Sequence, residues 1–193
     1  MNRAQLCHVL RAAAEVTGAT DLIVIGSQAV LGTYEEWRLP SEATRSVEAD
    51  IAVDLILAPD ATDTDESRLA DRIDGSIGEG SMFHQSFGYF GQGVETSTAT
   101  MTAGWRDRLV ALNCDAVSGG GVDAVGWCLE INDLWLSKAA AGREKDLEFC
   151  LALAADGLVD LDEIERRSDQ LAGRERDNAR VAIVRSRTLG SAD

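Results

Sequence analysis

The sequence predicts an α/β domain followed by a helical C-terminal segment. A wholly apolar run over residues 22–25 and an alternating run over residues 47–57 are typical of strands, and helical patterns continue from Asn132 to the end of the chain. We therefore expect the α/β domain over residues 1–131 and a helical segment, packed on it, over residues 132–193.

Composition limits the function classes. Hydrophobic residues make up 45% of the 193 residues, which is enough for an ordinary globular core. The net charge of −15 repels nucleic acid at long range and favours cationic partners, although a local basic patch could still contact RNA. No apolar run has the length of a membrane span, and the N-terminus does not read as a signal peptide. We expect a cytoplasmic protein with no membrane partner.

The four cysteines are scattered at positions 7, 114, 128 and 150, without a C-x-x-C pair or a Cys-His cluster. This spacing predicts neither a zinc site nor a disulfide framework, and free thiols suit a reducing cytoplasm.

The first part of the sequence predicts a helix, a strand and a short helix. Residues 2–17 have an apolar side with helical period. Leu22–Ile25 is expected to be a strand inside a sheet, because such wholly apolar strands are usually covered on both faces. A short helix over residues 28–34 and a polar loop over residues 35–46 follow.

The remaining elements are expected as follows. The second strand covers Val47–Leu57, and a helix ends near Asp74. The glycine-broken stretch over residues 76–85 is expected to be a loop, and residues 86–100 to contain a strand. Two further strands flank a glycine turn at residues 119–121.

Three helices are expected in the C-terminal segment. They cover residues 132–155, 161–172 and 174–189, and Asn132 or Asp133 caps the first of them.

The alternating strand carries a pair of acids. Glu48 and Asp50 are two residues apart, so their side chains leave the same face with about 7 Å between their backbone positions. Their oxygens can converge on magnesium, which prefers carboxylates together with phosphates and water. Asp54 lies further along the same face. Taken alone, alternating acids on a strand more often mark a solvated face.

A Gly-Ser pair follows the first strand. Gly26 would let the backbone approach a phosphate, and the Ser27 hydroxyl with the free N–H groups of the next helix could bind phosphate oxygens. A Gly-Ser after a strand is also a common turn. The order of the two features, each with an apolar strand, favours the functional interpretation.

The stretch "VIGSQAVLG … SVEADIAV" resembles the nucleotidyltransferase superfamily, which has the DNA-polymerase-β-like fold. Gly26 and Ser27 match its Gly-Gly or Gly-Ser element, and Glu48 and Asp50 match its pair of acids. The resemblance implies a small mixed sheet, acids that bind magnesium, and a Gly-Ser that binds nucleotide phosphates. The chain departs from the pattern by a longer spacer and by Glu in place of Asp at the first acid.

The superfamily usually has a third carboxylate on a later strand, as a metal ligand or as a base toward the acceptor hydroxyl. Glu95 is the candidate for this role, and Asp54 competes with it.

The stretch "INDLWLSKAAAGREKDLEF" resembles a helical segment of bacterial abortive-infection and toxin–antitoxin nucleotidyltransferases. Lys138, Arg143, Lys145 and Asp146 match its Lys, Arg and Lys-Asp pattern. On one continuous helix, Lys138 and Lys145 would be nearly stacked, with Gly142 leaving that face open to a ligand such as a triphosphate. A solvated face with acid–base pairs is an equally good interpretation.

The predicted function is a magnesium-dependent transfer of a nucleoside monophosphate from a nucleoside triphosphate to an acceptor hydroxyl. The catalytic candidates are Glu48, Asp50 and Glu95, and Gly26, Ser27, Lys138, Arg143 and Lys145 are candidates for nucleotide binding. By resemblance the acceptor is tRNA, the role is that of a toxin or defence effector, and an antitoxin is the partner. Two alternatives stay open: transfer to a cationic small molecule, which suits the net charge, and a degenerate fold that only binds or regulates.

Overall fold

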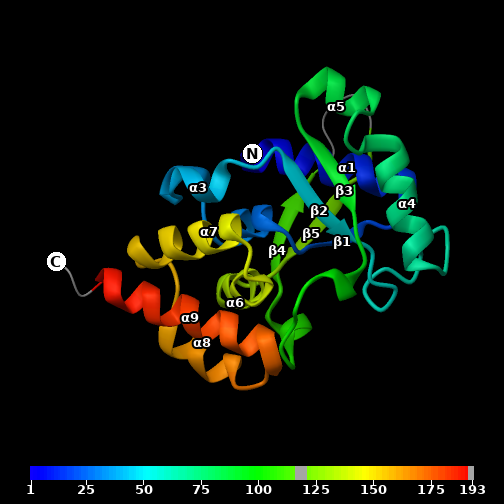
Figure 1. The fold of residues 1–193 in the computed structure, drawn as a ribbon. Coiled ribbons are helices and arrows are strands. Elements are labelled where there is room, and N and C mark those ends of the chain that lie inside the picture. The colour runs from blue at the N-terminus through cyan, green and yellow to red at the C-terminus, as the bar shows by residue number, and fades with distance from the viewer. Residues whose placement is uncertain (116–120, 191–193) are drawn as a thin grey trace.

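A computed structural model, which describes residues 1–115 and 121–190, confirms an α/β fold with a mixed sheet and a helical C-terminal stretch (Figure 1). The sheet has the strand order β3-β2-β1-β5-β4. Strand β1 runs antiparallel to β2 and parallel to β5, β2 runs parallel to β3, and β4 runs antiparallel to β5. The strands are β1 (Asp21–Val24), β2 (Glu48–Ala52), β3 (Phe90–Gly93), β4 (Val110–Cys114) and β5 (Ala124–Cys128).

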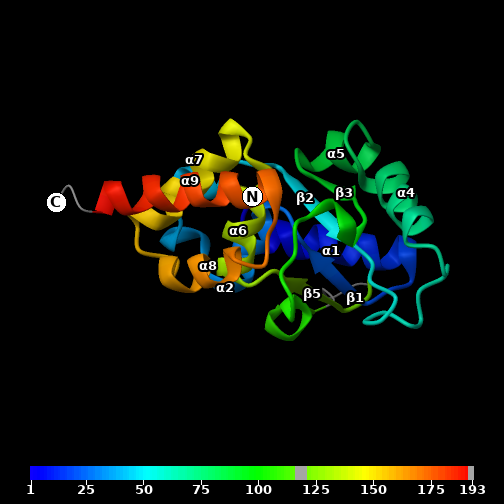
Figure 2. The same cartoon turned by 60° about the horizontal axis from the view of Figure 1, so that its bottom comes forward.

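The helices surround the sheet. Figures 1 and 2 show α4 and α5 at one end of the molecule and α7 to α9 at the other, with the sheet between them. None of the helices in the described ranges is both long and apolar enough to cross a membrane. The α-helices are α1 (Arg3–Thr17), α2 (Val30–Thr33), α3 (Ser41–Thr44), α4 (Glu66–Ile77), α5 (Met82–Phe87), α6 (Ile131–Ala141), α7 (Glu144–Ala155), α8 (Leu161–Ser168) and α9 (Gly173–Gly190). The 3₁₀ turns are η1 (Ser27–Ala29), η2 (Glu36–Arg38), η3 (Thr96–Thr98) and η4 (Trp105–Arg108).

One face of the sheet packs against α1 and α4. Ile51 of β2 is fully buried on this face, and a Cβ at Gly91 of β3 would lie only 2.9 Å from Val9 of α1. Because side chains alternate along a strand, Glu48 and Asp50 point to the opposite face. The fold therefore keeps both carboxylates out of the apolar core.

The second strand is shorter than expected. The prediction of a strand to Leu57 is wrong, because the chain turns at Asp54. The Asp54 carbonyl accepts hydrogen bonds from the amides of Leu57 (3.0 Å) and Ala58 (2.9 Å), and its carboxylate accepts one from Ile56 (2.9 Å). This Asx-type turn ends the pairing of β2.

Two predicted loops contain helical turns. Residues 35–46 include η2 and α3, and residues 76–85 include the start of α5. The Ser81 hydroxyl caps α5 by accepting a hydrogen bond from the His84 amide at 3.1 Å. The strand expected within residues 86–100 is the short β3. The expected glycine turn falls partly on residues 116–120, which lie outside the described residues.

The long helix expected over residues 132–155 is two helices. Helix α6 ends at Gly142, whose φ of 66° is left-handed, and α7 begins after the extended Arg143. A helix cannot continue through a left-handed residue, so the prediction of one stacked lysine face is wrong. The N-cap is Glu130, whose carboxylate accepts a hydrogen bond from the Asp133 amide, and not Asn132 or Asp133.

The space beside Gly142 is filled by α9. A Cβ at Gly142 would lie 2.3 Å from the Asn178 amide nitrogen, and this amide donates a hydrogen bond to the Ala140 carbonyl at 2.9 Å. Gly142 therefore serves a helix end and a close helix contact, and it does not open a face to a ligand as expected.

One apolar core connects the sheet with the C-terminal helices. The same cluster of buried residues includes Leu10 of α1, Ile51 of β2 and Ala179 of α9. At its helical end, Trp135 is fully buried and donates its indole N–H to the Cys150 carbonyl at 2.9 Å. Helices α6 to α9 thus pack on the α/β part, and the two parts share one continuous apolar core.

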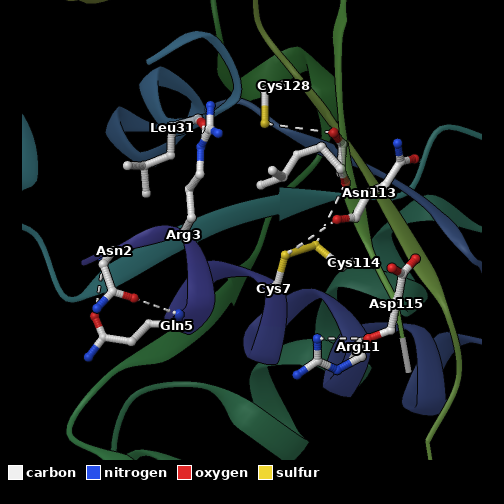
Figure 3. Close-up of a disulfide and its surroundings, with 12 residues drawn as sticks. Asn2, Arg3, Gln5, Cys7, Arg11, Leu31, Asn113, Cys114, Asp115 and Cys128 are labelled. Carbon is white, nitrogen blue, oxygen red and sulfur yellow. Dashed lines mark hydrogen bonds between the residues drawn. A yellow bond between two sulfur atoms is a disulfide. The ribbon is translucent and has the colours of Figure 1, made fainter. Parts of the chain in front are cut away.

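A disulfide joins the first helix to the edge of the sheet. Cys7 of α1 is bonded to Cys114 of β4 across a sequence separation of 107, with their Cα atoms 5.1 Å apart (Figure 3). The expectation of free thiols and no disulfide is wrong for this pair. Cys128 and Cys150 are free and buried, and burial raises the pKa of Cys128 to about 12.

Removing the disulfide should destabilise the fold. A cross-link that closes a loop of this length restricts the unfolded chain and typically contributes about 2–4 kcal/mol. Denaturant unfolding with and without reductant should therefore give a lower midpoint in reductant, and a Cys7→Ser, Cys114→Ser variant should be insensitive to reductant. Equal midpoints for the wild type in both conditions would contradict the bond.

Gly142→Ala should lower the free energy of unfolding by about 1–2 kcal/mol, because alanine is strained at positive φ and would meet Asn178. Gly75→Ala is the matched control. Gly75 lies inside α4, and a Cβ added there would meet no atom within 4 Å. Gly75→Ala should therefore raise the free energy of unfolding by about 0.5–1 kcal/mol. Urea unfolding measures both changes, and a stabilised Gly142→Ala protein would contradict the helix break.

Candidate functional site

The site begins where β1 ends against β2. The Ile25 amide donates a hydrogen bond to the Asp50 carbonyl at 3.2 Å, and Gly26 and Ser27 follow directly. A Cβ at Gly26 would lie 1.5 Å from an Asp50 carboxylate oxygen, although the φ of −83° is open to any residue. Position 26 is therefore glycine because the Asp50 side chain occupies the space that a larger residue would need.

Glu48 and Asp50 form a close acidic pair. The pKa of Glu48 is raised above its ordinary value, first by partial burial and then by repulsion from Asp50 and a side-chain hydrogen bond with it. The positive charges of Lys145 and Lys138 oppose this shift. The two carboxylates therefore lie close enough to repel each other, and a cation bound between them would relieve this repulsion.

Glu48 and Asp50 form one wall of a cleft, the acidic wall. The opposite, cationic wall comes from α6, α7 and the turn between them. Asp146 is almost fully buried and pairs with Lys138 at 3.3 Å and with the Arg143 guanidinium. Asp146 thus fixes two cations that lie on different elements. Lys145 lies in the first turn of α7 and stays exposed, within electrostatic reach of Glu48.

Two adjoining hollows lie between these walls. The larger hollow has a volume of about 530 Å³, and the smaller hollow has a volume of about 290 Å³. Asp50, Lys138 and Arg143 line both of them. Ser27, Glu48 and Lys145 line only the larger hollow, and Gly26 lines only the smaller hollow. The structure thus brings together seven of the eight residues predicted for catalysis or nucleotide binding.

Glu95 is the predicted residue that the structure leaves outside. It is exposed, follows the end of β3, and lines neither hollow. The β3 residue paired with Asp50 is Gln92, whose amide donates hydrogen bonds to the Asp74 carboxylate at 2.9 Å. The strand therefore presents an amide beside Asp50, where a third carboxylate was expected nearby.

Asp54, the competing candidate, is also engaged elsewhere. Its carboxylate is 1% exposed and accepts a hydrogen bond from the Arg106 guanidinium at 2.7 Å. This ion pair secures the turn that ends β2, and Asp54 lines neither hollow.

Several residues of the cleft were not predicted from the sequence. They come from the short helix α3, from loops, from the 3₁₀ turn η3 and from α6, and no pattern in the sequence marks them. They are Glu42, Arg45, Ser46, Glu79, Thr98, Thr100 and Ser137.

The acidic pair fits magnesium through its donors. Two carboxylates reach one region, and Gly26 leaves room for one of them. In the described ranges, no group of three or more His, Cys, Asp or Glu side chains is arranged as a metal site. The protein would therefore supply one or two carboxylates and leave the other positions to phosphate oxygens and water, as is usual for magnesium.

Glu48→Gln should stabilise the metal-free protein near neutral pH, because it removes a half-buried carboxylate repelled by Asp50. Because its pKa is raised in the folded state, the Glu48 carboxylate is protonated at a higher pH in the folded protein than in the unfolded chain. As the pH falls from neutral through the raised pKa of Glu48, the wild type should therefore gain stability relative to Glu48→Gln. The stability advantage of the variant over the wild type should shrink accordingly.

Thermal unfolding in chelator between pH 4 and pH 8 measures this difference. Glu15→Gln, an exposed position on α1, is the matched control and should show no such trend. An equal or lower Tm for Glu48→Gln than for the wild type at pH 7 would contradict the repulsion.

Comparison with known proteins gives a family match. No functionally curated protein and no solved structure matches the chain. A family model described as a nucleotidyltransferase of unknown function (DUF6036) matches residues 4–186. The match includes Gly26, Ser27, the acidic pair and the cationic wall. The chain therefore belongs to this nucleotidyltransferase family of unknown function.

Proposed function

We propose that the protein is a magnesium-dependent nucleotidyltransferase that moves a nucleoside monophosphate from a nucleoside triphosphate to an acceptor hydroxyl. One observation carries the proposal: Glu48 and Asp50 face Lys138 and Arg143 across a cleft that opens beside Ser27. The family match supports the reaction class.

The acidic wall and the cationic wall would bind different groups. Glu48 and Asp50 would hold magnesium, which supplies charge neutralisation at the reacting phosphate when it is bound. Lys138 and Arg143, fixed by Asp146, would bind the triphosphate oxygens. The Ser27 hydroxyl and the backbone at Gly26 lie where they can donate hydrogen bonds to the same group.

The reaction balances as a displacement at the α-phosphorus. The acceptor oxygen forms a bond to the α-phosphorus, the bond from that phosphorus to the bridging oxygen of the β-phosphate breaks, and pyrophosphate leaves. The hydroxyl proton passes to a base or to water. The cationic wall would balance the charge of the departing pyrophosphate.

The acceptor and the biological role remain predictions of the sequence resemblance. These are tRNA as the acceptor, a toxin or defence role, an antitoxin partner and a cytoplasmic location.

A second candidate function is a module that binds nucleotide without transfer. The observation that favours it is the β3 register, which places Gln92 beside Asp50 and leaves Glu95 outside the cleft. The two functions differ in pyrophosphate release, because a binding module would hold the triphosphate intact. An assay for labelled pyrophosphate released from γ-labelled nucleotide therefore separates them.

Calorimetry with magnesium and each of the four ribonucleoside triphosphates tests the proposal. Wild type should bind at least one of them only when magnesium is present, and a Glu48→Ala, Asp50→Ala variant should lose at least about 100-fold in affinity, because two metal ligands are removed. A Glu15→Ala, Asp156→Ala variant makes the same charge change at exposed positions and should bind normally.

Two results would overturn the proposal. Folded wild type that binds none of the triphosphates has no nucleotide site. Binding that the Glu48→Ala, Asp50→Ala variant retains would place the nucleotide away from the acidic pair.

A further inference from the structure

Helices α7 and α9 lie side by side on the surface of the helical segment (Figures 1 and 2). Both helices line a hollow of about 110 Å³, through Leu147 and Val181, and both line a second hollow of about 460 Å³, through Ala155 and Leu189. The two helices therefore pass from the first hollow to the second in the same chain direction, so they run parallel.

An apolar strip follows this pair of helices. Val181, Val184 and Leu189 of α9 are 52%, 64% and 50% exposed. Leu147 and Leu151 of α7 are one helical turn apart, and each of them lines one of the two hollows. Apolar side chains that gather in one exposed patch mark an interaction surface more often than scattered ones do.

Charges of opposite sign accompany the strip on the two helices. On α7 the exposed acids are Glu144 and Glu148, which are one turn apart. On α9 the exposed bases Arg174 and Arg185 lie seven residues before and four residues after Val181, on the same side of that helix. Helix α7 thus provides an acidic rim, and α9 provides a basic rim.

The charges of the two rims are largely free. Glu144, Arg174 and Arg185 have no ion pair with another described residue. Glu148 makes one ion pair, at 3.5 Å, with an arginine at the end of α3, and an exposed pair of this kind contributes little. Asp177 is the one acid beside the two arginines, so the basic rim keeps a net positive charge.

We propose that this face binds a second copy of the chain across a twofold axis that runs along α7 and α9. The inference goes beyond the proposed reaction and does not depend on it. Such an axis places α7 of each copy over α9 of its partner, with the two apolar strips in contact. The acidic rim of each copy then meets the basic rim of the other, and this pairing occurs twice.

Other occupants fit the face less well. A twofold axis across the helices would place acidic rim over acidic rim, and like charges placed across an interface oppose binding. A phosphate-bearing surface would meet the acidic rim at close range and a net charge of −15 at long range. A second copy supplies both signs of charge in the order that the face requires.

The proposed interface would border the cleft. Glu42, Arg45 and Glu148 line both the hollow of about 460 Å³ and the larger hollow of the cleft. The partner copy would therefore lie beside the mouth of the larger hollow.

Sedimentation velocity of the full chain tests the proposal. The wild type should sediment as a dimer at about 100 μM protein. Arg185→Glu and Glu148→Arg should each weaken the dimer at least about tenfold, because each change creates two like-charged contacts across the axis. Arg68→Glu on α4 and Glu15→Arg on α1 make the same charge changes at exposed positions on other helices and should leave the dimer unchanged.

An equal mixture of Glu148→Arg and Arg185→Glu is the decisive sample. In a dimer of the two variants, the new arginine of one chain meets the new glutamate of the other, and the unchanged Arg185 meets the unchanged Glu148. Both contacts again join opposite charges, so the mixture should recover the dimer that each variant loses alone. This recovery also shows that both variants are folded.

Four results would overturn the proposal. A wild type that stays monomeric at about 100 μM has no such interface. Equal weakening in the two control variants would mean a general effect of charge. Dimers that persist in both Arg185→Glu and Glu148→Arg, or a mixture of these two folded variants that stays monomeric, would place the contact elsewhere on the molecule.

Discussion

The arrangement of the cleft depends on the contact between Gly26 and the Asp50 carboxylate. Strand β1 can end directly against β2 only because position 26 has no side chain where the Asp50 oxygen lies. The hydrogen bond from the Ile25 amide to the Asp50 carbonyl fixes this junction, and the turn that follows brings Ser27 to the carboxylates. The glycine thus places an acid and a hydroxyl from two strands in one small volume.

The second wall depends on a helix that stops. Because Gly142 ends α6 in a left-handed conformation, α7 starts in a new direction and Asp146 turns back toward Lys138. A continuous helix would have carried Lys138 and Lys145 as a regular stripe. The break brings two cations, Lys138 and Arg143, to the buried Asp146, and α9 keeps the turn in place through Asn178.

Periodicity and order along the chain predicted much of this protein. The apolar period identified α1, the alternating acids identified β2, and the short motifs identified Gly26, Ser27, Glu48 and Asp50 as neighbours. Local patterns do not show where side chains from distant loops meet. This is why Glu79 and Thr98 in the cleft, and the engagement of Asp54 with Arg106, appear only in the structure.

The bond between Cys7 and Cys114 has a topological consequence. It makes a covalent ring of the chain between these residues, and Gly26, Glu48 and Asp50 all lie within that ring. A single break in an exposed connection such as the one around Asp60 opens the ring without releasing a fragment. The fragment that carries β1, β2 and both acids then stays bonded through the disulfide to the remainder of the chain, which carries Lys138 and Arg143.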